Sequence, residues 1–305
     1  MFRSAVLLAF LLAFGVILLG SYVRLSEAGL GCPDWPGCYG RMTVPLSVDD
    51  TYSRPLETGK AWKEMIHRYF AATLGLFVLF IAILSWIQKR HRFLATLLLA
   101  LVIFQALLGM WTVTLLLHPL IVMGHLFGGF ATLALLWWFV LGGESKFSLP
   151  FWPVMALFIL LLQILLGAWT SSNYAAFSCP DFPTCQGKWW PQMDFKEAFN
   201  LGVLGRDYQY GVLNTEGRVA IQMMHRIFAV ITFFVLLVLG LKAVRRKGME
   251  RFFGAGIALL VTGQVALGIS NILMFRPLPV AVAHTGVAAL LVVFLVGLIY
   301  SQQKS

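Results

Sequence analysis

Charge is scarce in this sequence. Only 12% of the 305 residues are charged and 59% are hydrophobic, whereas a soluble domain carries about 25% charged residues. This scarcity excludes an ordinary soluble domain. Eight apolar runs each approach the about 20 residues that a helix needs to cross a bilayer, so we predict an all-α integral membrane protein in the lipid bilayer. The predicted transmembrane helices cover residues 4–23, 66–88, 93–116, 120–141, 151–171, 219–241, 252–274 and 278–300.

The sequence also lacks the marks of a leader peptide. The first apolar run is long, and no small-residue cleavage site separates it from the polar stretch after Arg24. We therefore interpret it as a transmembrane helix and not as a signal peptide. No segment rich in Arg and Ser precedes it, which favours the inner membrane of a bacterium over an organelle.

Basic residues are missing from some connections and crowded in others. The connection between the third and fourth runs has none, and that between the seventh and eighth has only Arg276. By the positive-inside rule, both termini are expected in the cytoplasm and the long segments 24–65 and 172–218 in the periplasm. No basic stretch is interleaved with aromatic residues, so binding to nucleic acid is not expected. The crowded connections carry Lys89, Arg90 and Arg92, and Lys242, Arg245, Arg246, Lys247 and Arg251.

Cysteines occur only in the two long outer segments, where thiols can oxidise. The stretch GCPDWPGC in the first segment returns as SCPDFPTC in the second. Of the three pairings that four cysteines allow, locality favours Cys32–Cys38 and Cys179–Cys185, and each bridge would stabilise its loop by roughly 2 kcal/mol. Five residues separate the cysteines of each pair, unlike a CxxC motif, which weighs against a thiol oxidase built on these cysteines.

The two cysteine stretches belong to a longer internal repeat. LLGSYVRLSEAGLGC matches LLGAWTSSNYAAFSC with a shift of 147 residues, EMIHR matches QMMHR with a shift of 158, and QALLG matches QVALG with a shift of 159. We therefore predict two tandem, pseudo-symmetric four-helix bundles, an N-terminal half at 1–147 and a C-terminal half at 148–305. Because four is an even number, both halves run in the same direction and are expected to be related by an axis along the membrane normal.

Four of the six histidines lie in predicted helices at matched positions of the repeat, His67 with His225 and His125 with His284. All four fall in the outer third of the membrane, where a polar side chain is costly without a partner and often marks a ligand site. Each half offers two imidazoles at similar depth, which suits axial ligation of a haem iron, whereas zinc takes three or four protein ligands. A hydrogen bond between helices is the alternative. The residue four places later is small each time, which would clear space for a flat macrocycle or serve close helix packing: Ala71, Gly129, Ala229 and Ala288.

Two arginines and three glutamines in the helices are further candidates. Arg68 and Arg226 directly follow matched histidines, and they would pair with the propionate carboxylates of a haem or anchor the helix ends at the membrane interface. The glutamines each precede a glycine by four residues, and we interpret them as hydrogen-bond partners between helices: Gln105, Gln163 and Gln264.

The two halves differ beside the first histidine. Glu64 lies nearly one helical turn before His67 on the same face, and its counterpart in the second half is Gln222. A carboxyl group at the edge of an apolar site can exchange protons near neutral pH. Only the first half is thus equipped for proton chemistry, and the second suits a fixed electron-transfer cofactor. The alternative role of Glu64 is that of a carboxylate favoured by the helix dipole.

With EMIHR, GHLFGG, QMMHR, AHTGVAA and the paired loop cysteines, the whole chain resembles the haem A synthase family. These enzymes oxidise the C8 methyl group of haem O to a formyl group and so make haem A for terminal cytochrome oxidases. The resemblance implies that His225 and His284 ligate a resident haem B cofactor, that His67 and His125 face the haem O substrate, and that Glu64 is the catalytic acid.

The resemblance also implies partners. Haem O synthase is the expected substrate donor, an electron acceptor is required, and assembly into a homo-oligomer is left open. The Cys32–Cys38 bridge would take part in redox chemistry or brace a lid over the substrate site.

Two other functions stay open on the sequence. A di-haem cytochrome for quinol-linked electron transfer is expected to place its haems at opposite membrane depths, whereas all four histidines here share one side. A haem transporter or chaperone is not separated from the enzyme by these motifs.

Overall fold

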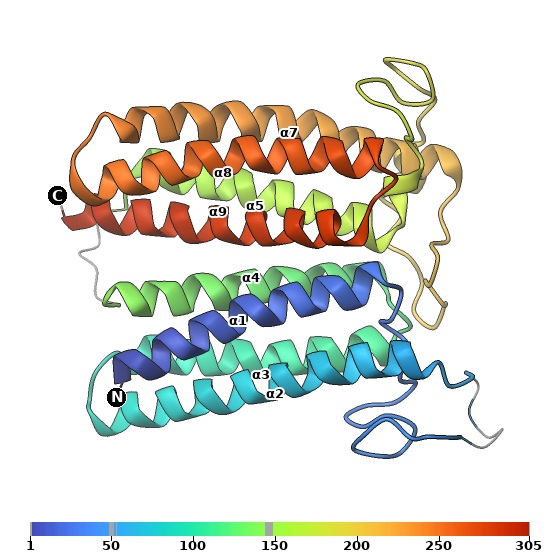
Figure 1. Cartoon of the computed structure of the whole chain (residues 1–305), viewed down its shortest axis with the longest axis horizontal. Helices are drawn as coiled ribbons and strands as arrows, with labels where there is room; N and C mark the ends of the chain where they lie inside the picture. The colour runs from blue at the N-terminus through green and yellow to red at the C-terminus, as the bar shows by residue number, and fades with distance from the viewer. Residues whose placement is uncertain (1, 49–51, 53, 144–148, 305) are drawn as a thin grey trace. The chain divides into compact units, whose positions relative to one another are not determined.

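The chain folds into helices long enough to cross a membrane. The computed structural model describes residues 2–48, 52, 54–143 and 149–304, and these contain eight helices whose length and composition suit a bilayer span (Figure 1). The prediction of an all-α, multi-pass membrane protein is confirmed. The spanning helices are α1 (Phe2–Leu25), α2 (Thr58–Ile87), α3 (Arg92–Thr114), α4 (Pro119–Leu141), α5 (Phe151–Ser172), α7 (Thr215–Val244), α8 (Gly248–Leu273) and α9 (Leu278–Lys304).

Three helices begin at least four residues earlier than predicted: α8 at Gly248 instead of residue 252, and the two that carry His67 and His225. α2 starts at Thr58 instead of residue 66, and α7 starts at Thr215 instead of residue 219. A hydropathy pattern ends at charged side chains such as Lys60, but the hydrogen bonding of the helix backbone continues through them. The prediction that His67 and His225 open their helices is therefore wrong. At about 3.6 residues per turn, both histidines lie in the third turn.

The chain divides into two compact units. Unit 1 comprises Met1–Thr132 and Asn200–Val212, and unit 2 comprises Leu133–Phe199 and Leu213–Ser305. Within unit 1, α2 packs against α1 and α3; within unit 2, α7 packs against α5 and α8, and α8 packs against α9. The predicted boundary between the halves, at residues 147 and 148, lies outside the described residues.

Both predicted disulfides are present, and each closes a small loop ahead of a histidine-bearing helix. Cys32 pairs with Cys38 across a Cα–Cα distance of 4.8 Å, and Cys179 pairs with Cys185 across 4.6 Å. The cysteine pairing inferred from locality is therefore confirmed.

An aspartate holds each cysteine loop in shape. The Asp34 carboxylate accepts hydrogen bonds from the backbone N–H groups of Tyr39 and Gly40, both at 2.6 Å. The Asp181 carboxylate accepts from the two residues after Cys185, at 2.6 and 3.0 Å. These N–H groups belong to no helix or strand, and the aspartate side chain gives them the partner that regular backbone pairing would supply. The repeated aspartate of the two stretches thus has a structural reason.

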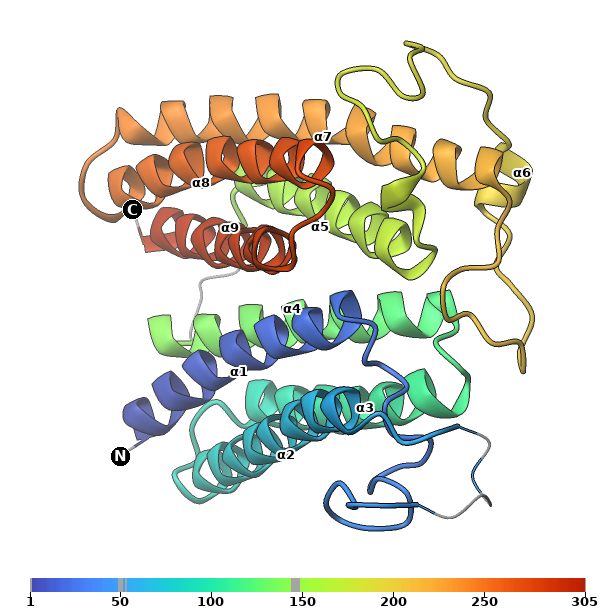
Figure 2. The same cartoon turned by 45° about the vertical axis from the view of Figure 1, so that its right-hand side comes forward.

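Part of the segment ahead of α7 folds with unit 1. The short helix α6 (Phe195–Ala198) packs beside the start of α7 in unit 2 (Figure 2), but residues 200–212 belong to unit 1. There Arg54 forms an ion pair with Asp207, and the N–H of Tyr208 donates to the Leu116 carbonyl at 3.0 Å. No pattern in the sequence indicated this docking.

Candidate functional site

Unit 1 brings two of the predicted ligands together. His67 of α2 and His125, in the second turn of α4, have ring centroids 6.5 Å apart and perpendicular ring planes. Both residues are partly buried. The Nδ1 atom of each ring is buried and has no hydrogen-bond partner among the described residues. A bound ion or ligand is one recognised reason for such an atom in a native protein.

Unit 2 holds the other two predicted ligands. His225 of α7 and His284, in the second turn of α9, are partly buried and close enough to interact electrostatically. Each unit therefore pairs one imidazole in the third turn of a helix with one in the second turn of another.

In unit 1, both imidazoles lie against glycines of neighbouring helices. A Cβ atom at Gly20 of α1 would be 2.9 Å from Cε1 of His67, and one at Gly109 of α3 would be 3.3 Å from Cε1 of His125. Real Cβ atoms essentially never approach within 3.0 Å of another heavy atom. The ring of His67 thus occupies space that any other residue at position 20 would fill.

The same contacts recur in unit 2. A Cβ atom at Gly167 of α5 would be 3.1 Å from Cε1 of His225, and one at Gly268 of α8 would be 3.3 Å from Cε1 of His284. These glycines end the repeated stretches LLG, QALLG and QVALG, but sequence reasoning treated them only as repeat markers. The available signal was that each glycine recurs in step with the histidine that it touches.

Two glutamines of unit 2 contact the histidines. Gln163 Nε2 lies 3.1 Å from Nδ1 of His225 and donates to the His225 backbone carbonyl at 3.2 Å, and Gln264 Nε2 lies 3.3 Å from Nε2 of His284. The predicted hydrogen bonds between helices are therefore confirmed for these two residues. Gln105 contacts His125 in unit 1, and its buried Nε2 has no partner in the described part of the chain.

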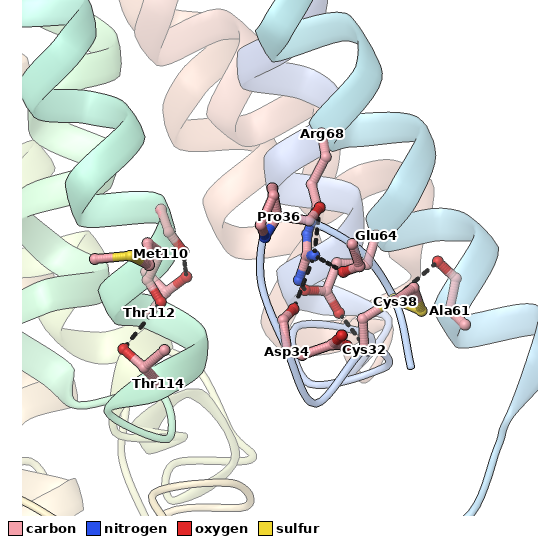
Figure 3. Close-up of polar contacts among 12 residues, drawn as sticks. Cys32, Asp34, Pro36, Cys38, Ala61, Glu64, Arg68, Met110, Thr112 and Thr114 are labelled. Carbon is pink, nitrogen blue, oxygen red and sulfur yellow. Dashed lines mark hydrogen bonds and ion pairs between the residues drawn. A yellow bond between two sulfur atoms is a disulfide. The ribbon is translucent and has the colours of Figure 1, made fainter. Parts of the chain in front are cut away.

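Glu64 and Arg68 form an ion pair along α2, and both side chains reach the first cysteine loop (Figure 3). Arg68 Nη2 donates to Glu64 Oε1 at 2.5 Å, and the backbone N–H of Cys32 donates to Glu64 Oε2 at 2.9 Å. Arg68 Nη1 also donates to the carbonyls of Asp34 at 2.9 Å and Gly37 at 2.5 Å. The candidate acid and the candidate propionate partner thus fasten the loop to the helix that carries His67.

In unit 2 the arginine is retained and the acid is replaced. Arg226 donates to the carbonyls of Thr184 at 2.8 Å and Cys179 at 2.9 Å. Gln222 is as buried as Glu64, but its Oε1 has no partner within the described ranges. Both units therefore join a cysteine loop to a histidine-bearing helix through an arginine, and among the described residues unit 1 alone adds a carboxylate to this contact.

The spacing of the imidazoles in unit 1 is compatible with one shared metal ion. Metal–nitrogen distances of about 2.0–2.1 Å, as for imidazole on zinc, place the ring centroids on either side of an ion roughly 6 Å apart. The observed 6.5 Å between His67 and His125 is of this size. An edge-to-face aromatic pair has similar spacing, so the two unpartnered Nδ1 atoms are what favour a ligand. The donor set fits a haem iron, which imidazoles ligate axially.

Comparison with known proteins extends over nearly the whole chain. Residues 3–296 match the family model COX15-CtaA, described as cytochrome oxidase assembly protein. The chain is 41% identical over 303 residues to the Heme A synthase of Shewanella oneidensis, covering 93% of this chain and 92% of that protein. It is 27% identical to the Heme A synthase of Rhizorhabdus wittichii over 325 residues, covering 93% and 89%, and 27% identical to that of Paracoccus denitrificans over 331 residues, covering 92% and 82%. The chain therefore belongs to the COX15-CtaA family of haem A synthases.

Proposed function

We propose that the two units have different tasks in the conversion of haem O to haem A, unit 1 binding the haem O substrate and unit 2 holding a haem B cofactor. The overall reaction, carried out by an oxidoreductase, is that of the family to which the chain belongs. The observation that carries the division is a matched set of four imidazoles, each against a glycine. Among the described residues, a buried carboxylate accompanies these imidazoles in unit 1 and not in unit 2.

In unit 1, His67 and His125 are the proposed ligands of the haem O iron. This assignment is supported by the 6.5 Å distance between the two ring centroids and by the glycine that lies against each ring. Glu64, nearly one turn before His67, is the proposed acid that holds or releases a proton as the C8 methyl group is oxidised to a formyl group. Its hydrogen bonds to Arg68 and to the Cys32 N–H keep the carboxylate in one orientation.

In unit 2, His225 and His284 are the proposed ligands of haem B. When bound, haem B supplies an iron centre that accepts electrons one at a time. Gln222 cannot ionise, so nothing at its position exchanges protons with a bound macrocycle. This difference between Glu64 and Gln222 supports the assignment of substrate to unit 1 and cofactor to unit 2.

The arginines have unequal capacity for haem propionates. Arg226 has a buried Nε with no partner among the residues described, and this donor supports pairing with a propionate in unit 2. Arg68 engages Glu64 and the loop carbonyls through its two terminal nitrogens. We therefore propose that Arg68 binds a propionate while it keeps its ion pair with Glu64.

We also propose that the chain lies in a bacterial inner membrane with both termini in the cytoplasm and both cysteine loops in the periplasm. The uneven distribution of Lys and Arg supports this orientation. The two disulfides support it independently, because such bonds persist in oxidising compartments. Haem O synthase would supply the substrate, and a separate acceptor would take the electrons.

The division of tasks is tested by exchanging the residue that distinguishes the units. Glu64→Gln copies the unit 2 residue into unit 1, and we expect it to leave haem B bound and stop formation of haem A. The matched control Gln222→Glu should keep haem B bound and should still form haem A. Pigments are extracted from cells and from purified protein and are separated by chromatography. Normal haem A from Glu64→Gln would contradict the division.

A second pair of variants tests the cofactor site. His225→Ala and His284→Ala should each strip haem B from the purified protein, whereas His67→Ala should retain it and lose haem A formation. Recovery of haem B and haem O alone from cells with the unchanged chain would argue against synthase activity altogether.

A further inference from the structure

The pentapeptides VILLG and QILLG occupy equivalent places in α1 and α5. They are related by the shift of 147 residues that aligns the cysteines, and they differ only in their first residue. The glycine that ends each one lies against an imidazole, of His67 in unit 1 and of His225 in unit 2. The first residue lies one turn earlier on the same helix face. It is Val16 in unit 1 and Gln163 in unit 2.

Gln163 holds His225 at two points. Its Nε2 lies 3.1 Å from Nδ1 of the ring and donates to the backbone carbonyl of the same residue at 3.2 Å. A glutamine amide can donate or accept, and Oε1 of Gln163 is buried without a partner among the described residues. Turning the amide would therefore present an acceptor to an Nδ1–H. The turned amide gives up its bond to the backbone carbonyl, but it places the proton of the neutral ring on Nδ1 and leaves the Nε2 of His225 free for a metal.

His67 has no such support. The side chain of Val16 cannot form a hydrogen bond, and Nδ1 of His67 is buried with no partner in the part of the chain that the structure describes. The two imidazoles thus share a glycine contact and differ in whether the second ring nitrogen is held.

We propose that Gln163 is a positioning residue that makes His225 a permanent haem ligand, and that Val16 at the equivalent place leaves His67 a releasable one. The inference rests on the proposed function, in which a cofactor stays in unit 2 while substrate and product pass through unit 1. A metal-ligating histidine almost always donates its other N–H to an acceptor, which fixes the ring and raises its basicity. Loss of such a partner typically lowers metal affinity by about 10–100-fold.

Gln264 is not assigned the same role. It contacts His284 through Nε2, at 3.3 Å, and the Nδ1 of His284 has no partner among the residues described. A contact at Nε2 competes with a metal for that nitrogen, so it does not support ligation in the way that a contact at Nδ1 does.

The variant Gln163→Met tests the proposal, because methionine has nearly the shape of glutamine and no amide. Purified protein is mixed with excess haem-free myoglobin, and the release of haem B is followed by absorption. We expect release to become about 10–100-fold faster. A redox titration should also give haem B a more positive potential, because a less basic imidazole stabilises the ferric state less. Gln163→Glu keeps an acceptor of similar reach and should restore slow release, and its negative charge should move the potential below that of the unchanged protein.

The reciprocal variant Val16→Gln tests unit 1 without disturbing unit 2. It should slow the release of haem O or haem A by roughly tenfold and leave the potential of haem B unchanged, and it keeps the proposal testable if Gln163→Met does not fold. A lower melting temperature of Gln163→Met, with release and potential unchanged, would show that Gln163 only braces two helices and would overturn the proposal. His225→Ala separates the two ideas: if it retains haem B, the proposed function fails, and if it loses haem B while Gln163→Met behaves as the unchanged protein, the positioning role alone fails.

Discussion

In unit 1 both Glu64 and Arg68, themselves an ion pair, bond the helix that carries His67 to its cysteine loop, whereas in unit 2 Arg226 is the charged residue that does so among those described. For the imidazoles, unit 2 has the additional contact: Nδ1 of His225 has an amide partner, and Nδ1 of His67 has none among the residues described. The repeat thus keeps the contacts that place the imidazoles, and single polar substitutions change what surrounds them. Geometry and reactivity are specified by different residues.

The ion pair of unit 1 is expected to give the largest effect. Arg68→Ala leaves the Glu64 carboxylate buried without its counter-charge, and breaking a buried pair in this way costs about 3–5 kcal/mol in the free energy of unfolding. The measurement is denaturation of the purified protein in detergent, followed by tryptophan fluorescence.

The control for this prediction is the double variant Glu64→Gln with Arg68→Ala, which makes position 64 resemble unit 2. It should lose less stability than Arg68→Ala alone, because no charge remains buried. Equal losses for the single and double variants would show that the carboxylate is not what distinguishes the two loops.

Gly20→Ala should disable unit 1 while sparing unit 2. The added Cβ would lie 2.9 Å from Cε1 of His67, so the imidazole must move, and a displacement of about 1 Å in a reacting site can cost roughly 100-fold in rate. Haem A formation is measured by pigment chromatography. Gly15→Ala on the same helix is the matched control, because nothing in the described chain lies within 4 Å of its Cβ position. Equal activity of the two variants would refute a role for the glycine contact.

Gly268→Ala should act on unit 2 more mildly. Its Cβ would lie 3.3 Å from Cε1 of His284, so the ring needs to yield by only a few tenths of an ångström. We expect haem B to be retained but released several-fold faster, by the logic that ligand orientation sets metal affinity. Gly263→Ala, whose Cβ position has no neighbour within 4 Å among the residues described, should leave release unchanged. Faster release from both variants would point to a general effect of alanine on α8.

The smallest effect concerns the two loop aspartates. A hydrogen bond from the Thr184 hydroxyl, with backbone N–H groups of the loop adding to it, lowers the pKa of Asp181 below its ordinary value. Thr184 has Gly37 as its counterpart in the first loop. A group with a lowered pKa in the folded state stabilises that state above its unfolded pKa of about 3.9, and this contribution is lost as the pH falls through the folded value.

Acidification below about pH 4 should therefore loosen the second cysteine loop. The backbone N–H groups of Gln186 and Gly187 donate hydrogen bonds to Asp181, so their rate of hydrogen exchange reports this change. Thr184→Gly should shift the loosening to higher pH, and Asp181→Asn should abolish its pH dependence. If Asp181→Asn exchanges at the same rate as the unaltered protein at every pH, the carboxylate does not hold the loop.

Some features of the site could be predicted because they depend on residues close together in the chain. The Cys32–Cys38 and Cys179–Cys185 pairing followed from spacing, since five intervening residues keep two thiols near each other. The pairing of His67 with His125 followed from the repeat and from the cost of placing a polar ring in lipid. The early start of α2 could not be predicted from hydropathy, because its first turns are polar and still helical.

Other contacts depended on packing that no local pattern contains. Gln163 was expected to bond across helices, but its partner, His225, is 62 residues away. The docking of residues 200–212 on unit 1 joins Arg54 to Asp207 across 153 residues. The sequence repeat identified the glycines that lie against the rings, but it could not predict which histidine each glycine contacts.

The amino-acid sequence alone thus specified eight membrane spans, two disulfide loops and two matched histidine pairs, because lipid burial, loop closure and repetition act on neighbouring or copied residues. Tertiary structure decided which glycine lies under which imidazole, which histidine gains an amide partner, and that the Glu64 carboxylate bonds the first cysteine loop. Those outcomes depend on the rotation of each helix about its axis, and that rotation is set by all of its packing partners together.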